Sequence, residues 1–210
     1  PALAGVTPHI RINPEAARSQ ALMNRSAAFG GQLPENMRIG GGVDPVPPKV
    51  GNVVGLVLLA DFSDINGTIS VTEVNNYCNQ VGYSNNGNNG SVSDYFDDVS
   101  NGALNYTMDV SDDYWEGTGG SFAAYYDDCT QPWLSRAIEL IEEILDDMEA
   151  NGTDFSTYDS NGDGEIDAIN LYFAGGGTAC GWAKGMWPGS GGMGGSWSAD
   201  GVSANRFQIT

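Results

Sequence analysis

The hydrophobic pattern between Gln131 and Ala150 predicts one long amphipathic helix. Apolar residues recur there at steps of three and four, and acidic residues fill the positions between them. Pro132 suits the first helical position, and Asn151-Gly152 ends the helix. We therefore expect helix 132–150 to pack one face against a core and to expose a solvated acidic face rather than a catalytic cluster. The acidic residues are Glu139, Glu142, Glu143, Asp146, Asp147 and Glu149.

Three further segments have the patterns of β-strands. Residues 53–60 form an almost continuous apolar run, which is typical of a strand buried on both faces. Segments 103–110 and 166–174 alternate and are rich in β-forming residues. Residues 202–210 begin another strand. The pattern predicts an α/β (α+β) fold, a twisted mixed sheet with helix 132–150 packed on one face.

Two shorter helices are expected between the first two strands. Thr72 is a suitable N-cap for a helix that continues to Cys78. Ser91 and Asp94 form a variant of the capping box, with a hydroxyl at the N-cap and a carboxylate three residues later. Asn101-Gly102 ends this second helix. Its apolar residues share one face: Val92, Tyr95, Phe96 and Val99.

Glycine dominates residues 175–195. Such a backbone suits a chain that crosses a cleft or follows a sheet edge. The glycines match neither a phosphate-binding loop nor a dinucleotide fingerprint. The tryptophans of this region, Trp182, Trp187 and Trp197, suit core packing or, when exposed on the glycine loops, stacking on sugar rings.

Residues 159–167 resemble a calcium-binding loop. Oxygen-bearing side chains occupy alternate positions, and Gly164 stands sixth, where such a loop turns sharply. Position twelve is Asn170 instead of glutamate, so a further ligand such as Asp154 is needed. The alternative is a solvated acidic turn without metal. The predicted ligands are the side chains of Asp159, Asn161 and Asp163, the carbonyl of Glu165, and Asp167 directly or through water.

The charge distribution bounds the partners. The formal net charge is −19, from 27 acidic residues against eight Lys and Arg. Residues 1–49 hold five of the cations and three of the acids, so the remainder carries three cations and 24 acids. With so few Lys and Arg there is no basic face to neutralise the phosphates of a nucleic acid, so we expect no nucleic-acid partner. The sequence contains no apolar run of about twenty residues, so we expect no membrane span. The acidic composition and the calcium loop favour a secreted, extracellular protein.

The sequence lacks the residues that several common catalytic centres require. His9 is the only histidine, which excludes a Ser-His-Asp triad or a histidine-based zinc site within residues 51–210. No spacing singles out a pair of carboxylates for glycoside hydrolysis. Of the three cysteines, we expect Cys129 and Cys180 to pair, because each lies beside an end of the helix–loop–strand unit, while Cys78 competes. The residues alone thus indicate a secreted, calcium-stabilised α/β domain without an identifiable catalytic centre.

The order of segments resembles the immune inhibitor A family of secreted bacterial zinc metalloproteases. The matching stretches are residues 55–64, residues 90–104, the calcium loop with its strand to Gly175, and Met186-Trp187-Pro188. Together they cover most of residues 51–190. The resemblance implies a zincin-like upper lobe and zinc-dependent hydrolysis of protein or peptide substrates. In this family a His-Glu-x-x-His helix binds zinc and activates water.

The resemblance also implies the domain organisation. Residues 1–50 resemble the tail of a pro-segment and a linker, with a disordered terminus as the alternative, and the pro-segment's cations would lie on the acidic domain. Residues 51–210 correspond to the N-terminal part of the catalytic domain, before the zinc helix, and Gly189 stands where the family has a histidine. The chain as given is therefore expected to be inactive. The alternative function is a non-catalytic, calcium-dependent extracellular module that binds glycans or proteins.

Overall fold

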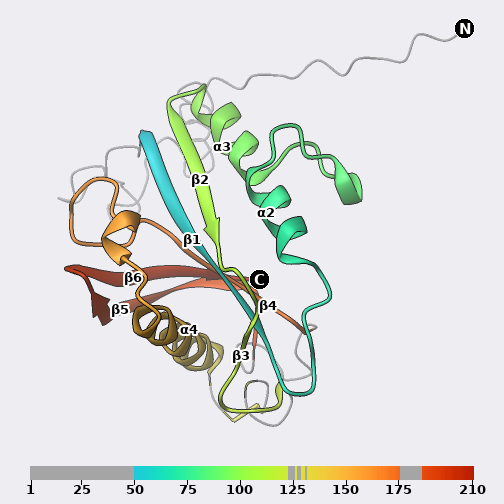
Figure 1. Cartoon of the computed structure of the whole chain (residues 1–210), viewed down its shortest axis with the longest axis vertical. Coiled ribbons are helices and arrows are strands. Elements are labelled where there is room, and N and C mark those ends of the chain that lie inside the picture. The colour runs from blue at the N-terminus through green and yellow to red at the C-terminus, as the bar shows by residue number, and fades with distance from the viewer. Residues whose placement is uncertain (1–49, 123–125, 127–128, 131, 176–185) are drawn as a thin grey trace, which may run out of the picture.

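The computed structural model describes residues 50–122, 126, 129–130, 132–175 and 186–210, and for Trp133 the backbone alone. Within these residues six strands form one sheet with the order β2-β1-β4-β6-β5, and β3 also pairs with β1 (Figure 1). The predicted pro-segment tail lies outside the described residues except for Val50. The fold is therefore a mixed α/β architecture, as the sequence predicts.

The sheet is mostly parallel. β1 (Gly51–Asp61) runs parallel to β2 (Leu104–Val110), to the short β3 (Trp115–Glu116) and to β4 (Ile169–Phe173). β6 (Val202–Ile209) is parallel to β4, and only β5 (Gly189–Ala199) is antiparallel to its neighbour. The carboxyl ends of β1, β4 and β6 therefore lie at the same edge of the sheet.

The predicted burial of β1 on both faces is confirmed. Leu56, Leu58 and Ala60 belong to one core cluster, whereas Val57 and Leu59 belong to a second. Because successive side chains of a strand point to opposite faces, the two clusters lie on the two sides of the sheet. β1 is thus the central element of the fold.

The long helix α4 (Trp133–Ala150) packs on the first face of the sheet, as predicted. Its apolar residues Ala137, Leu140, Ile141, Ile144 and Leu145 are almost fully buried. Pro132 is the N-cap rather than the first helical residue. The acidic residues of α4 are exposed or half-exposed, as predicted. Two of them also hold β5, because Glu142 accepts a hydrogen bond from Ser196 and Asp146 accepts one from the Trp197 indole at 2.8 Å.

Two short helices cover the β1–β2 part of the second face (Figure 1). The N-cap of α2 (Val71–Asn79) lies two residues before the predicted cap, because the hydroxyl of Ser70 and not that of Thr72 accepts the amide of Glu73. α3 (Val92–Ser100) has the predicted capping box of Ser91 and Asp94 and ends at Asn101 in the left-handed conformation. These helices leave β4 and β6 uncovered on this side.

Only half of the residues on the predicted apolar face of α3 pack against the core. Val92 and Phe96 pack against the second core cluster, whereas Tyr95 and Val99 are 61% and 45% exposed. Among the helices that the structure describes, none combines the length and apolar composition needed to cross a membrane.

Candidate functional site

The acidic loop at residues 159–167 connects α4 to β4 and is firmly anchored at both ends. Tyr158, which precedes the loop, is buried and donates a hydrogen bond of 2.6 Å to Asp109 on β2. Its carbonyl accepts the amide of Asp167 at 2.8 Å, so the two ends of the loop meet. Burial, together with the bond to Asp109, raises the pKa of Tyr158, so this hydroxyl stays a donor.

The centre of the loop is organised around Asp159. Its two carboxylate oxygens accept the amides of Gly162, Asp163 and Gly164 at 2.8 to 3.1 Å. Gly162 and Gly164 both have positive φ, +71° and +81°, which is the conformation that favours glycine. The predicted sharp turn at the sixth position is therefore present.

The predicted calcium ligands are arranged in two groups. Asp159, Asn161 and Asp163 lie together, and the Asn161 amide donates to Asp163 at 2.7 Å. Asp167 instead accepts the amide of Ser160 at 2.8 Å, and Glu165 is an exposed residue. The suggested extra ligand Asp154 is the N-cap of a short 3-10 helix, η4 (Phe155–Tyr158). Within the described residues, no three side chains of His, Cys, Asp or Glu converge closely enough to hold a metal ion.

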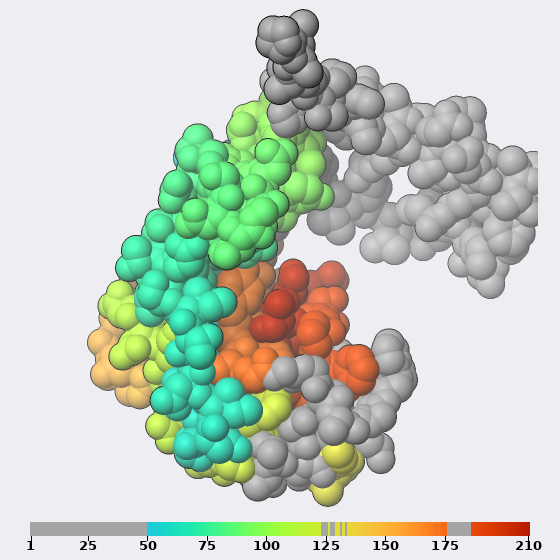
Figure 2. All heavy atoms as spheres, turned by 90° about the vertical axis from the view of Figure 1, so that its right-hand side faces the viewer, coloured from blue at the N-terminus to red at the C-terminus, as the bar shows by residue number. Residues whose placement is uncertain are grey.

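A groove lies on the second face of the sheet, between the two short helices and strands β4 and β6. Figure 2 shows it as a hollow with α2 and α3 on one side and the orange and red segments of β4 to β6 on the other. Its first cavity has a volume of about 840 Å³. Asp167 lines one end of this cavity and Tyr172 the other, so the groove follows β4 from the acidic loop toward the opposite sheet edge.

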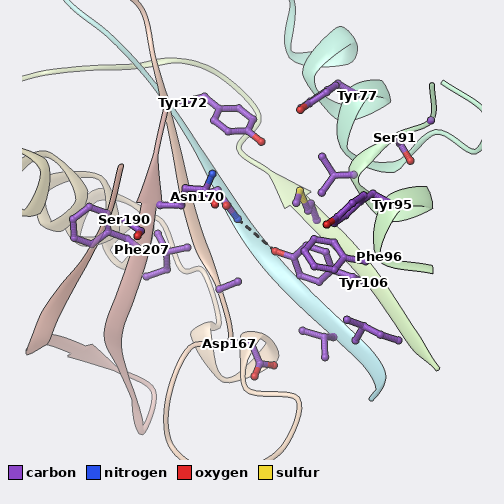
Figure 3. Close-up of a pocket in the computed structure, with 18 of the residues that line it drawn as sticks. Tyr77, Ser91, Tyr95, Phe96, Tyr106, Asp167, Asn170, Tyr172, Ser190 and Phe207 are labelled. Atoms are coloured by element: carbon purple, nitrogen blue, oxygen red, sulfur yellow. Dashed lines mark hydrogen bonds between the residues drawn. The ribbon is translucent and has the colours of Figure 1, made fainter. Parts of the chain in front are cut away.

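Several aromatic side chains line this cavity. Figure 3 shows Phe96 and Tyr106 on one wall, and their rings lie 4.9 Å apart in a T-shaped contact. The opposite wall carries Asn170, a buried polar residue of β4, whose amide donates to the Tyr106 hydroxyl at 3.4 Å. Burial raises the pKa of Tyr106, so this hydroxyl stays protonated over the ordinary pH range. The pattern of β-strands alone gave no indication of this groove, because its walls come from segments that are far apart in the chain.

The two described tryptophans of the glycine-rich region are buried or half-buried. Trp197 is only 7% exposed and contacts Phe155 in the core, so its proposed exposure for sugar stacking is wrong. Trp187 is half-buried, and Trp182 lies outside the described residues.

Cys129 is disulfide-bonded and Cys78 is a buried free thiol, so Cys78 does not compete for Cys129. The predicted partner, Cys180, lies outside the described residues.

Comparison with known protein families and with curated proteins finds no match to this chain.

Proposed function

We propose that the chain is the calcium-stabilised N-terminal part of a secreted zinc metalloendopeptidase, with a zincin-like upper lobe formed by the sheet and α4. The proposal starts from the resemblance of residues 51–190 to the immune inhibitor A family. By that resemblance, the zinc helix belongs to a longer protein that continues past Thr210. The chain alone then hydrolyses no peptide bond, and residues 1–50 serve as the tail of its pro-segment.

The observation that best supports a peptide-binding role is the position of β5. It is the last strand in the order of the described sheet and is antiparallel to β6. An edge strand presents backbone amides and carbonyls, with which an extended peptide pairs as an added strand. Five glycines in β5 keep side chains away from that edge: Gly189, Gly191, Gly192, Gly194 and Gly195.

Calcium is the cofactor that the acidic loop supports. The donors are all oxygens, as a hard cation requires, and the loop is anchored to β2 through Tyr158 and to β6 through Ser203. Asp159, Asn161 and Asp163 would hold the ion with the Glu165 carbonyl and Asp167. A bound ion would screen the carboxylates from one another and connect the end of α4 to β4.

The experiment is to read the gene beyond Thr210 and to assay the longer protein. We expect a His-Glu-x-x-His sequence within a few dozen residues, and hydrolysis of a protein substrate that stops when zinc is chelated. The 210-residue chain, assayed in parallel, should be inactive. A complete reading frame without this motif would remove the metalloprotease proposal.

The aromatic groove favours a second candidate function, a non-catalytic calcium-dependent binding module. The burial of Trp197 weakens the tryptophan-based form of this idea, whereas the tyrosines of the groove remain available to a ligand. Glycan-array binding that disappears with a calcium chelator would support this candidate. Absence of binding to every glycan would count against it.

A further inference from the structure

A second cavity lies where the sheet changes its direction of winding. From β1 the chain leads through α2 and α3 to β2 on one side, whereas β4 leads to β5 and β6 on the other. In open α/β sheets, the crevice outside the carboxyl ends of two such strands is the usual ligand site. A cavity of about 820 Å³ occupies this position, lined by residues 65–69 after β1 and by residues 173–175 at the end of β4.

Tyrosine rings line this second cavity from both sides. Tyr77 of α2 is 37% exposed, and its ring lies 5.9 Å from that of the buried Tyr83 in a T-shaped contact. Tyr172 of β4 faces Tyr77 from the opposite wall (Figure 3). Tyr77 and Tyr172 line both cavities and therefore stand at their junction. Tyr114 adds a further ring, fixed by a hydrogen bond of 2.9 Å from its hydroxyl to the carbonyl of Ile69.

One carboxylate, that of Glu73, stands beside these rings. Glu73 and Tyr77 are four residues apart on α2 and therefore lie on the same face of the helix. The Tyr83 hydroxyl and the Asn85 amide both donate to Oε1 of Glu73, at 2.7 and 3.0 Å. These bonds hold the pKa of Glu73 below its usual value, with the Tyr83 bond as the largest cause. The carboxylate is thus oriented and charged, and it lines the cavity beside the tyrosine rings.

The other polar side chains of the lining are neutral amides and hydroxyls, and among the described residues no lysine or arginine lines the cavity. An anionic ligand would find no cationic side chain here and would enter the acidic part of the chain against its charge. A cation would meet one oriented carboxylate and several tyrosine rings. The face of such a ring attracts positive charge through its quadrupole.

From this arrangement we propose that the cavity at the carboxyl ends of β1 and β4 binds a compact organic cation, an ammonium group held between Tyr77 and Tyr172 and paired with Glu73. The ammonium group belongs either to a quaternary headgroup or to a lysine side chain. This site is separate from the acidic loop, which precedes β4 and lies at the opposite edge of the sheet. The proposal rests on neither protease activity nor calcium binding.

The test is calorimetric titration of the 210-residue chain in a buffer free of amines. The probes are choline, Nα-acetyl-lysine amide, and 3,3-dimethylbutanol, which has the shape of choline without its charge. We expect at least one cationic probe to bind about tenfold or more tightly than the neutral alcohol, because a desolvated cation–π contact contributes such a factor. Binding of choline alone would indicate a headgroup, and binding of the lysine probe alone would indicate a side chain.

Variants separate the proposed contacts from general charge effects. Glu73→Gln and Tyr77→Leu should each lower the affinity for the cationic probe by about tenfold, since each removes one proposed attraction. Glu149→Gln, an equal charge change at an exposed position of α4, should leave the affinity unchanged. Melting temperatures within a few degrees of the parent chain would show that the variants are folded. Equal binding of the neutral alcohol, no binding of either cation, or full affinity in Glu73→Gln would overturn the proposal.

Discussion

Replacing Gly191 by alanine tests how α4 supports the edge strand β5. A Cβ atom at this position would lie 2.5 Å from Cδ1 of Leu134 and 2.9 Å from Cζ of Phe207. Both distances are shorter than van der Waals contact. The Leu134 side chain has rotational freedom near the start of α4, but the ring of Phe207 is 4% exposed and enclosed by the core. The added methyl group must therefore displace β5 or Phe207.

The expected loss follows from the cost of overpacking. Inserting a methyl group into a well-packed core costs about 1–3 kcal/mol, partly offset by the lower entropy of the unfolded chain with alanine. We expect a net loss of about 2 kcal/mol, which corresponds to about 4–8 °C in melting temperature for a domain of this size.

The neighbouring glycine supplies a matched control. At Gly192 a Cβ atom would meet only the carbonyl of Asn205, at 3.6 Å, which is ordinary contact. Gly192→Ala should therefore melt within about 2 °C of the parent chain. Thermal melts followed by circular dichroism compare the two variants directly. Equal melting temperatures for Gly191→Ala and the parent chain would refute the packing of α4 beneath β5.

Three further changes have defined outcomes. Burial raises the pKa of the Cys78 thiol to about 11 from 9.0, so its iodoacetamide labelling at pH 8 should be about a hundredfold slower than in denatured protein. The thiol of the unfolded chain ionises at a lower pH than that of the folded chain. The contribution of Cys78 to the free energy of unfolding therefore falls as pH rises from about 9 to 11, and an unchanged free energy over that range would contradict the raised pKa. Ser91→Ala removes the N-cap acceptor of α3 and should cost about 1 kcal/mol in urea unfolding, whereas an unchanged midpoint would show that the cap contributes nothing. Trp197→Phe removes the bond to Asp146 and part of a core ring, and should lower the melting temperature by several degrees; an unaltered melt would contradict the burial of Trp197.

The sequence predicted those parts of the fold in which local and long-range preferences agree. The three-and-four spacing of α4 and the apolar run of β1 each satisfy one consistent burial pattern, and both are confirmed. The capping box of Ser91 was predictable because it depends on residues only three positions apart. The start of α2 was missed because Ser70 and Thr72 are both good caps, and only tertiary packing selects between them.

Other features depend on partners distant in the chain. The glycines of β5 carry little strand propensity, and their pairing with β6 rather than local preference makes residues 189–199 a strand. Trp197 is buried because its indole reaches Asp146 on α4, 51 residues earlier. The groove could not be predicted for the same reason, since Tyr77, Tyr106 and Tyr172 meet only after three elements have assembled.

The most direct test of the proposed calcium site is the melting temperature of the chain with calcium and with a chelator. At a hundredfold excess of calcium over Kd, binding to the folded state adds about 2.7 kcal/mol, or about 5–10 °C for a chain of this length. Asp163→Ala should abolish most of this calcium-dependent difference and leave the rest of the fold intact. Protein shown by elemental analysis to contain calcium, yet with a melting temperature that EDTA leaves unchanged, would contradict the stabilising role assigned to residues 159–167.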